Sequence, residues 1–482
     1  MRNHVRTFVN GRPHRVSGSL ASTSVAEFLR SALRLTGTKN ACNEGDCGAC
    51  TVLVGRAQDD FCYQAINSCL HFVFQLDGAH VITIEGLTAQ GQTALATALA
   101  EGHGVQCGFC TPGIVMAMTA AENASAHRTF PRTPAAIRSA LAGNLCRCTG
   151  YAQIIEALGT TRAPETSLDE LFPAESMLEE ARQSSHDSIL LESDDGSTIF
   201  LPATLEEGLQ YLAENPDVDI VNGATDAGVH WNQTRTVPKK RLCLARILDL
   251  TKISIDPEYV TLGASASISR ITKALEPLLP DFAQILERFG STQIRNCATI
   301  GGNLASGSSV ADCIPWLFAH GAEVELISVE GSRRMSVEDF AKGGKERTAI
   351  RVGEIISRIS LPRPAAGSVQ RFYKASKRRH VDIGTVTAAI VTELSAGMIR
   401  KARVAFGGVG PIVMRLRQAE ATLEGSRYCS ETFIRAAQVA ARGAIPQDDL
   451  RGSARYRQLL ISNLLERYYW DTCQALPTAL LN

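Results

Sequence analysis

The sequence has no excess of charge of either sign and no long apolar run. Lysine plus arginine and aspartate plus glutamate number 49 each, so no overall field favours nucleic acid or an acidic membrane surface. No apolar stretch approaches the roughly 18 residues of a membrane span, and the stretch MRNHVRTFVNGRPHRV has no apolar core of a secretory signal. We therefore expect a protein of the reducing cytoplasm.

Two common enzyme patterns are also missing. No Ser/His/Asp arrangement or carboxylate pair stands out by spacing, so the sequence predicts no acid/base catalytic residue in this chain. No strand leads into a GxGxxG motif, so a Rossmann site is not indicated. At 482 residues the chain is too long for one hydrophobic core, and we expect about three or four domains.

Cysteine is the residue that the sequence concentrates. Nine of the 14 cysteines lie within the first 148 residues, and eight of them form two sets of four with different spacings. The first set is Cys42, Cys47 and Cys50 with a later partner, in the spacing of plant-type [2Fe-2S] ferredoxins. The partner is Cys62 or Cys69. We prefer Cys69, which lies in AINSCL, and expect Cys62 to be a buried thiol.

The second set consists of Cys107 and Cys110 together with Cys146 and Cys148. A Thr-Pro pair, which signals a helix start, follows Cys110 directly and recurs at residues 133–134. Two helices joined by a loop lie antiparallel, so the start of the first meets the end of the second and the four thiols gather there. Cys146 and Cys148 must lie in a turn, because a helix would point them about 200° apart.

Clustered thiols in a reducing compartment are more often metal ligands than disulfides. Gly45 and Gly48 let the first loop curl around a cluster and aim N–H groups at its sulfurs. Zinc is the alternative for paired cysteines, and it would make the chain a zinc-stapled scaffold without enzymatic activity. Iron–sulfur is favoured for both sets, and two neighbouring one-electron centres predict electron transfer.

Local patterns indicate the elements around these sites. Residues 5–9 and 14–16 alternate about Asn10-Gly11 and predict a hairpin, while residues 24–35 carry apolar residues at helical spacing. A capped helix after residues 202–204 and a short strand lead into the glycine loop of DIVNGATDAG.

A second glycine loop, ATIGGNLASGSSVAD, lies further along the chain. Such loops present backbone amides to phosphate. Gly301, Gly302 and Asn303 permit close backbone approach. Ser306 offers a hydroxyl, and Asp312 can meet a ribityl hydroxyl or a ring nitrogen.

The motifs CNEGDCGACTV, QCGFCTPG and GNLCRCTGY resemble the paired [2Fe-2S] domains of the molybdenum hydroxylases, the xanthine dehydrogenase and aldehyde oxidase family. The resemblance supports Cys69 as the fourth ligand and implies a multidomain α+β protein. Its implied parts are a ferredoxin-like β-grasp [2Fe-2S] domain at 1–88, a four-helix [2Fe-2S] domain at 89–160, a linker at 161–190, a vanillyl-alcohol-oxidase-type FAD domain at 191–366, and a C-terminal α+β domain at 367–482.

The two glycine loops resemble the FAD-binding domain of the same family. Phe289 and Ile356 are expected to border the isoalloxazine ring. Arg379, His380 and Val381 stand where the family usually has acidic residues near the flavin. The positions that the resemblance assigns to FAD are Ile220, Val221, Asn222, Gly223, Ala224, Thr225, Asp226, Ala227, Phe289, Thr299, Ile300, Gly301, Gly302, Asn303, Asp312, Ile356 and Lys374.

The resemblance implies the iron–sulfur and FAD subunit of a two-subunit xanthine dehydrogenase. No segment remains for the molybdopterin-binding portion, so we expect it on a separate large subunit, in a heterotetramer of two small and two large subunits. Electrons are expected to pass from molybdenum through the helical and then the ferredoxin-like cluster to FAD and NAD⁺. A partner that oxidises an aldehyde or an N-heterocycle, or a self-contained flavin reductase, is the alternative to this function.

Overall fold

The computed structural model describes residues 1–56, 62–124, 130–161, 166–173, 175–184, 186–344, 348–365 and 367–474. The chain forms two compact units. Unit 1 contains Met1–Ile247 and Ser291–Ala298, and unit 2 contains Leu248–Gly290 and Thr299–Asn482. The short piece Ser291–Ala298 therefore belongs to unit 1 although both its chain neighbours belong to unit 2.

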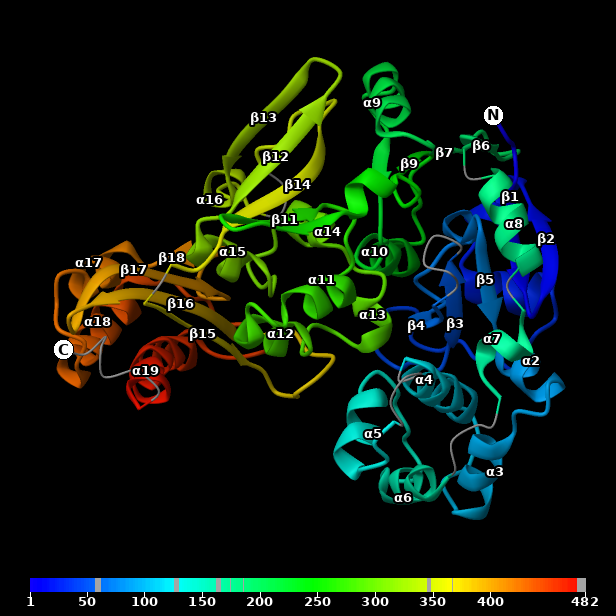
Figure 1. The fold of residues 1–482 in the computed structure, drawn as a ribbon, viewed down its shortest axis with the longest axis horizontal. Helices are drawn as coiled ribbons and strands as arrows, with labels where there is room; N and C mark the ends of the chain where they lie inside the picture. Colours follow the sequence, from blue (N-terminus) through cyan, green and yellow to red (C-terminus); the bar gives the residue numbers. More distant parts are fainter. Residues whose placement is uncertain are drawn as a thin grey trace. The chain divides into compact units, whose positions relative to one another are not determined.

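Unit 1 begins with a five-stranded sheet in the order β2-β1-β5-β3-β4 (Figure 1). Strands β1 and β5 run parallel and the other neighbours are antiparallel. The predicted hairpin is confirmed, since Asn10 and Gly11 have φ values of 49° and 79°, as a two-residue I′ turn requires. The strands are β1 (Val5–Val9), β2 (Arg12–Val16), β3 (Thr51–Arg56), β4 (Gln64–Asn67) and β5 (Ala79–Ile82).

The predicted helix at 24–35 is shorter and is partly a π-helix. The Ser24 hydroxyl accepts a hydrogen bond from the Glu27 N–H over 3.2 Å and caps α1 (Val25–Glu27). The π-helical turn η2 (Phe28–Ala32) continues it. The buried side chains of Val25, Phe28 and Leu29 pack on the sheet, so apolar spacing placed the buried face correctly.

Four helices form the second part of unit 1 (Figure 1). They are α3 (Ala94–Glu101), α4 (Thr111–Asn123), α5 (Pro134–Ala140) and α6 (Ala152–Thr160). Helix α3 packs against α4 and α6, and α5 packs against the same two helices. The Thr133 hydroxyl caps α5 as predicted, accepting from the Ala136 N–H over 3.3 Å. Helix α4 starts one residue earlier than predicted, because Cys110 rather than Thr111 is its N-cap.

The rest of unit 1 is a four-stranded sheet in the order β6-β7-β9-β8 with short helices. Thr204 caps α9 as predicted, accepting from the Glu207 N–H over 3.3 Å. The apolar core of this sheet continues into that of the first sheet, where Val52 and Phe74 lie in the same cluster as Ile199. The elements are α2 (Ile84–Ala89), α7 (Leu168–Leu171), α8 (Glu175–Ser184), β6 (Ile189–Glu192), β7 (Thr198–Leu201), α9 (Leu205–Glu214), β8 (Asp219–Val221), α10 (Ala227–Thr234), β9 (Lys240–Cys243) and α13 (Thr292–Arg295).

Unit 2 contains two sheets, β10-β11-β14-β12-β13 and β15-β16-β17-β18. The stacked rings of Phe282 and Trp316, with centroids 3.6 Å apart, lie in its core. No described helix of either unit is long and apolar enough to cross a membrane. The strands are β10 (Ile253–Ile255), β11 (Tyr259–Gly263), β12 (Glu323–Ser328), β13 (Gly331–Ser336), β14 (Ile355–Pro362), β15 (Ser368–Ala375), β16 (Val386–Ser395), β17 (Met398–Gly407) and β18 (Met414–Arg415); the helices are α11 (Ile268–Leu275), α12 (Pro280–Leu286), α14 (Ile300–Ala305), α15 (Ile314–His320), α16 (Val337–Phe340), α17 (Arg417–Leu423), α18 (Ser430–Gly443) and α19 (Ala454–Cys473).

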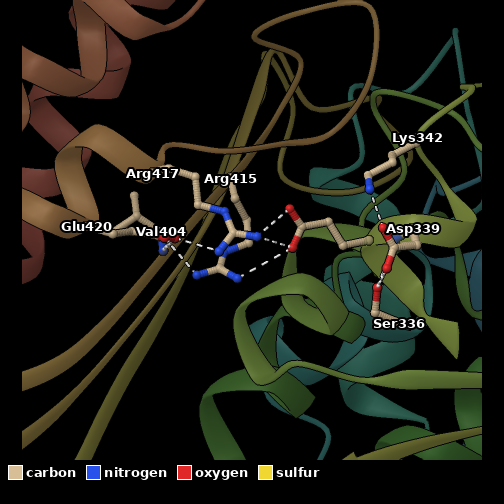
Figure 2. Close-up of polar contacts among 8 residues, drawn as sticks. Ser336, Asp339, Lys342, Val404, Arg415, Arg417 and Glu420 are labelled. Atoms are coloured by element: carbon tan, nitrogen blue, oxygen red, sulfur yellow. Dashed lines mark hydrogen bonds and ion pairs between the residues drawn. The ribbon is translucent and has the colours of Figure 1, made fainter.

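An ion-pair network joins α16 to β18 and α17 within unit 2 (Figure 2). Buried Glu420 accepts two hydrogen bonds from Arg415, at 2.9 and 2.7 Å, and one from the Val404 N–H at 2.8 Å. Arg415 and the more exposed Arg417 both pair with Glu338. The buried pair fixes α17 against the edge of the sheet.

Removing the Glu420 carboxylate should destabilise unit 2. In Glu420→Gln the buried Arg415 keeps its charge and loses its principal partner, which is expected to lower the free energy of unfolding by about 3 kcal/mol. Urea unfolding measures the change. Lys342→Met, which removes the exposed ion pair with Asp339 drawn beside it in Figure 2, is the control and should leave the unfolding midpoint unchanged. Equal unfolding midpoints for the two variants would contradict the stabilising role of the buried pair between Arg415 and Glu420.

Acid should destabilise unit 1 through His80. Its Nε2 accepts the Gly11 N–H over 2.9 Å, and burial lowers the pKa of His80 to about 4, against about 6.5 in an unfolded chain. Between these values the unfolded state binds a proton that the folded state does not. The free energy of unfolding should therefore decrease as the pH is lowered through this window, and the loss should reach about 2 kcal/mol near pH 5. Thermal unfolding of His80→Gln should show a smaller decrease than the wild type, and an identical decrease would contradict this origin.

Candidate functional site

The first cysteine loop carries three thiols on a tightly curled backbone. Asn43, Gly45 and Gly48 have φ values of 58°, 79° and 66°, in the left-handed region that glycine enters most easily. The Cys47 N–H donates to Sγ of Cys42 over 3.4 Å. This contact matches the expectation that the loop aims backbone amides at sulfur.

Strand β4 and the turn after it bring Cys69 to this loop. Cys69 is 1% exposed, and its thiol contacts those of Cys42 and Cys50. Asn67 braces the site, because its amide donates to the Gly45 carbonyl over 3.1 Å and its Oδ1 accepts from the Cys50 thiol over 4.0 Å. Sequence reasoning did not single out Asn67, although it lies within AINSCL.

Cys62, the alternative fourth ligand, is exposed. The prediction that it is a buried thiol is wrong. The neighbouring Tyr63 takes the inward position instead, and its hydroxyl forms a 2.7 Å hydrogen bond with buried His80. Cys62 therefore points outward, whereas Tyr63 is buried.

The four thiols of the first set crowd one another. Contacts with Cys47 and then Cys69 lower the pKa of Cys42, while contacts with Cys42 and then Cys50 raise the pKa of Cys69. Mutual repulsion prevents all four from ionising together in the absence of a cation. Bound iron removes this restriction, so the donor set fits an iron–sulfur cluster.

The second set gathers where α4 begins and α5 has ended. Sγ of Cys148 lies 3.6 Å from Sγ of Cys107. Burial and contact with Cys146 raise the pKa of Cys110 to about 12. Neither Cys146 nor Cys148 lies in a helix, as predicted; Cys148 lies in a bend, and Cys146 directly precedes this bend.

Tyr151 holds the turn that carries this second pair. It has a φ of 73°, and its hydroxyl accepts the Cys146 N–H over 2.8 Å and donates to the Asn144 carbonyl over 3.4 Å. Sequence reasoning did not single out Tyr151 as a residue that supports the cysteine turn. Tyr151 is the last residue of GNLCRCTGY, so the signal was present in a motif that carries the family resemblance.

Thiol contacts join the cysteines of each set in two pairs, and in the first set a further contact between Cys42 and Cys69 connects the two pairs. A cluster of two irons takes two thiolates at each iron, so a paired arrangement suits it. Among the described residues, no three His, Cys, Asp or Glu side chains are placed to hold a single metal ion. The pairs are Cys42 with Cys47, Cys50 with Cys69, Cys107 with Cys148, and Cys110 with Cys146.

A backbone hydrogen bond connects the two sets directly. The Leu145 N–H donates to the Cys47 carbonyl over 2.9 Å, and Leu145 precedes Cys146 in the chain. One hydrogen bond and a few covalent bonds therefore separate a cysteine of each set.

The first predicted flavin loop lies in unit 1 between β8 and α10. Ala224 has a φ of 59°, and Gln75 donates its amide to the Asn222 carbonyl over 2.7 Å. A Cβ on Gly223 would lie 2.0 Å from the Cys297 carbonyl, so glycine is required here for packing. Ile220 and Val221 lie on β8, Asn222 to Asp226 form the turn with Thr225 inside it, and Ala227 begins α10.

The second predicted loop lies in unit 2. Its central residues, Ile300–Ala305, form the helix α14, so the prediction of a loop at these residues is wrong. The Thr299 hydroxyl caps α14, accepting from the Gly302 N–H over 3.1 Å. A Cβ on Gly301 would lie 2.7 Å from the Ala264 carbonyl. This close packing uses the glycine within a helix, where tertiary contact overrides its low helix propensity.

Two buried side-chain oxygens of unit 2 accept no hydrogen bond from the described residues. Oδ1 of Asn303 and Oδ1 of Asp312 have no hydrogen-bond partner among the described residues, and such an acceptor costs about 1–3 kcal/mol. The other oxygen of Asp312 lies 2.6 Å from Nζ of Lys374. Burial raises the pKa of Asp312, and Lys374 opposes the shift. Ribityl hydroxyls and the ring N–H group can donate hydrogen bonds to these oxygens, so these residues fit FAD.

Lys374 is held by Arg288, a residue that the sequence did not point to. Nζ of Lys374 donates to the Arg288 carbonyl over 3.1 Å, and the Arg288 guanidinium donates to the Lys374 carbonyl over 2.9 Å. Phe289, next to Arg288, is half-buried. Ile356 is buried on β14 opposite Leu326. The Ser306 hydroxyl donates to the Asn303 carbonyl over 2.8 Å, at the C-terminal end of α14.

The segment that departs from the family pattern is strained at Val381. Its φ is 50°, which is an outlier for a β-branched residue. The Val381 N–H donates to the Gly290 carbonyl over 3.3 Å, and Arg288 donates to the Arg379 carbonyl over 3.4 Å. These contacts hold the segment beside Lys374.

Four domain families match the chain, and together they span most of it. The matches are the 2Fe-2S iron-sulfur cluster binding domain at residues 7–73, the [2Fe-2S] binding domain at 83–159, the FAD binding domain in molybdopterin dehydrogenase at 195–364, and the CO dehydrogenase flavoprotein C-terminal domain at 371–472. Each cysteine set lies within one of the two iron–sulfur domain matches, and both predicted flavin segments lie within the FAD-binding domain match.

Curated relatives are similar across the chain but are much longer. Xanthine dehydrogenase 1 of Arabidopsis thaliana is 27% identical, with 96% of this chain and 39% of that protein covered. Xanthine dehydrogenase/oxidase of Mus musculus is 28% identical, with 98% and 39% covered. Aldehyde oxidase 4 of Cavia porcellus is 27% identical, with 97% and 39% covered. The chain thus spans about two fifths of the length of these relatives.

Solved structures share the fold of part of the chain. Carbon monoxide dehydrogenase from Hydrogenophaga pseudoflava has a TM-score of 0.54 and 25% identity over 57% of this chain and 96% of that one. Quinoline 2-oxidoreductase from Pseudomonas putida 86 has a TM-score of 0.53 and 27% identity over the same shares. The multidomain α+β architecture is confirmed. The chain belongs to the molybdenum hydroxylase family, of which it carries two [2Fe-2S] domains and the FAD-binding domain.

Proposed function

We propose that the chain is the electron-transfer subunit of a cytoplasmic xanthine dehydrogenase, carrying electrons from a molybdenum cofactor on a partner chain to FAD and then to NAD⁺. The observation that carries this proposal is the pairing of eight cysteines in two sets linked by the hydrogen bond from Leu145 to Cys47. When bound, the clusters exchange single electrons and FAD exchanges two. The chain's own residues hold these groups and tune them by burial and hydrogen bonding.

Exposure of the helical set supports a docking surface for the partner. Cys107 and Cys148 are exposed, and Phe109 between the first two ligands of this set is 43% exposed. Cys50 and Cys69 of the other set are buried. An exposed aromatic side chain is typical of interface cores, so the proposal places a molybdopterin-binding large subunit on this surface, within a heterotetramer of two small and two large subunits.

A second candidate keeps the architecture and changes the partner's substrate. The relatives include a protein named aldehyde oxidase 4, and the similar structures include quinoline 2-oxidoreductase and carbon monoxide dehydrogenase. These names favour an aldehyde or an N-heterocycle as the alternative to a purine.

Purification of the chain with its co-purifying polypeptide tests the proposal. The complex should contain iron, FAD and molybdenum, and xanthine should reduce NAD⁺. Oxidation of an aldehyde or quinoline in place of xanthine would favour the second candidate. A colourless chain without flavin, or purine oxidation by the chain alone, would refute the proposed division of labour.

A further inference from the structure

Gln293 joins the two cysteine loops although it lies far from them in sequence. It is 1% exposed on α13, within unit 1. Its amide donates to Oδ1 of Asn144 over 2.9 Å and to the Thr51 hydroxyl over 3.2 Å. The residue falls inside the match to the FAD-binding family, so a flavin-domain side chain completes a network among the cluster loops.

Asn144 and Thr51 carry the network into the first cysteine loop. The Asn144 amide donates to the Gly48 carbonyl over 3.0 Å, and the Thr51 hydroxyl donates to the same carbonyl over 2.6 Å. Both side chains are buried. In a low-dielectric interior, bonds of this kind strengthen one another and hold their partners rigidly.

Each partner of Gln293 stands beside a cysteine of a different set. Thr51 follows Cys50 directly, and Asn144 is two residues before Cys146. A movement of either loop would therefore break a bond to Gln293. The side chain therefore bridges the two cysteine loops.

The hydrogen bonding of Gln293 argues against a role in stability alone. Its Oε1 is buried without a partner among the described residues, which costs stability. A Cβ on Gly143 would lie 2.2 Å from this oxygen, so the loop backbone is fitted closely around the side chain. An apolar residue of the same length would avoid the cost but would supply no donor to Asn144 or Thr51.

We propose that Gln293 is a positioning residue that fixes the separation of the two [2Fe-2S] clusters and thereby the electron transfer between them. The proposal rests on the proposed function of the two cysteine sets. Sites that must hold a fixed geometry are supported by buried side chains of this kind. The segment Ser291–Ala298 also leads directly into Thr299, the first predicted FAD residue of the second flavin segment.

Gln293→Met tests the proposal, because it keeps the length of the side chain and removes both donors. In the dithionite-reduced protein each cluster carries an unpaired spin, and the dipolar splitting of the low-temperature EPR spectrum falls with the cube of their separation. The variant should lose the wild-type splitting while its iron content stays at the wild-type level. Gln75→Met is the matched control, since buried Gln75 of the same unit donates to Asn222 and not to a cysteine loop; it should keep the wild-type splitting.

Wild-type splitting in a fully loaded Gln293→Met protein would overturn the inference. If that variant does not load iron, Asn144→Asp takes its place, because it removes the donor to Gly48 and keeps the acceptor for Gln293. A loaded Asn144→Asp protein with unchanged splitting would overturn the inference equally. Absence of any EPR signal from the wild type would instead refute the proposed function.

Discussion

Replacing Cys69 with serine should halve the iron content and remove one of two [2Fe-2S] EPR signals. Cys69 is buried, and its thiol contacts those of Cys42 and Cys50. A serine hydroxyl does not ionise near neutral pH as a thiol bound to iron does. The signal of the helical-domain set should persist, because its four thiols are untouched. Iron analysis and EPR of the dithionite-reduced protein measure both effects.

Cys62→Ser provides the matched control for this experiment. Cys62 is the other cysteine between the first loop and the helical domain, and it is exposed. The control should retain the full iron content and both signals. Iron loss in Cys62→Ser together with full iron in Cys69→Ser would reverse the assignment of the fourth ligand.

Gly48→Ala should destabilise unit 1 and reduce its cluster content. The added Cβ would lie 2.1 Å from the Gly143 carbonyl and 2.7 Å from Nδ2 of Asn144, so the contact between the two cysteine loops has to open. The φ of 66° adds strain for any L side chain. Together we expect a loss of about 3 kcal/mol or more in the free energy of unfolding. Urea unfolding and iron content measure the outcome.

Gly18→Ala separates the two causes. Gly18 has a similar φ of 62°, and a Cβ there would meet nothing within 4 Å. Only the backbone strain remains, so we expect a loss of about 1 kcal/mol and unchanged iron. If the two alanine variants were equally stable, the clash at the loop contact would not be the cause.

Sequence reasoning succeeded where the signal was local. The convergence of the second cysteine set followed from two helix starts and their antiparallel packing, and the 3.6 Å contact of Cys107 with Cys148 agrees with it. The hairpin turn at Asn10-Gly11 and the helix cap at Thr133 were likewise predictable from the identities of neighbouring residues. Such features depend on backbone preferences that a few residues determine.

Sequence reasoning failed where contacts between residues distant in the sequence determine the local structure. Glycines of the second flavin segment predicted a loop, but packing of Gly301 on Ala264 favours a helix. The hydrogen bond from Gln293 to Thr51 joins residues 242 positions apart in the sequence, and no local sequence pattern predicts it. The flavin-site assignments for Phe289 and Ile356 remain predictions that rest on the resemblance.

The return of Ser291–Ala298 to unit 1 limits how this protein can be dissected. A protease that cuts the chain after Ile247 would leave the two units still joined by the chain at two further points, between residues 290 and 291 and between residues 298 and 299. A fragment that stops at Ile247 would lack α13 and its glutamine. An intact iron–sulfur part therefore requires two separate pieces that reassociate, so truncation experiments on this chain would remove support from the very clusters they aim to isolate.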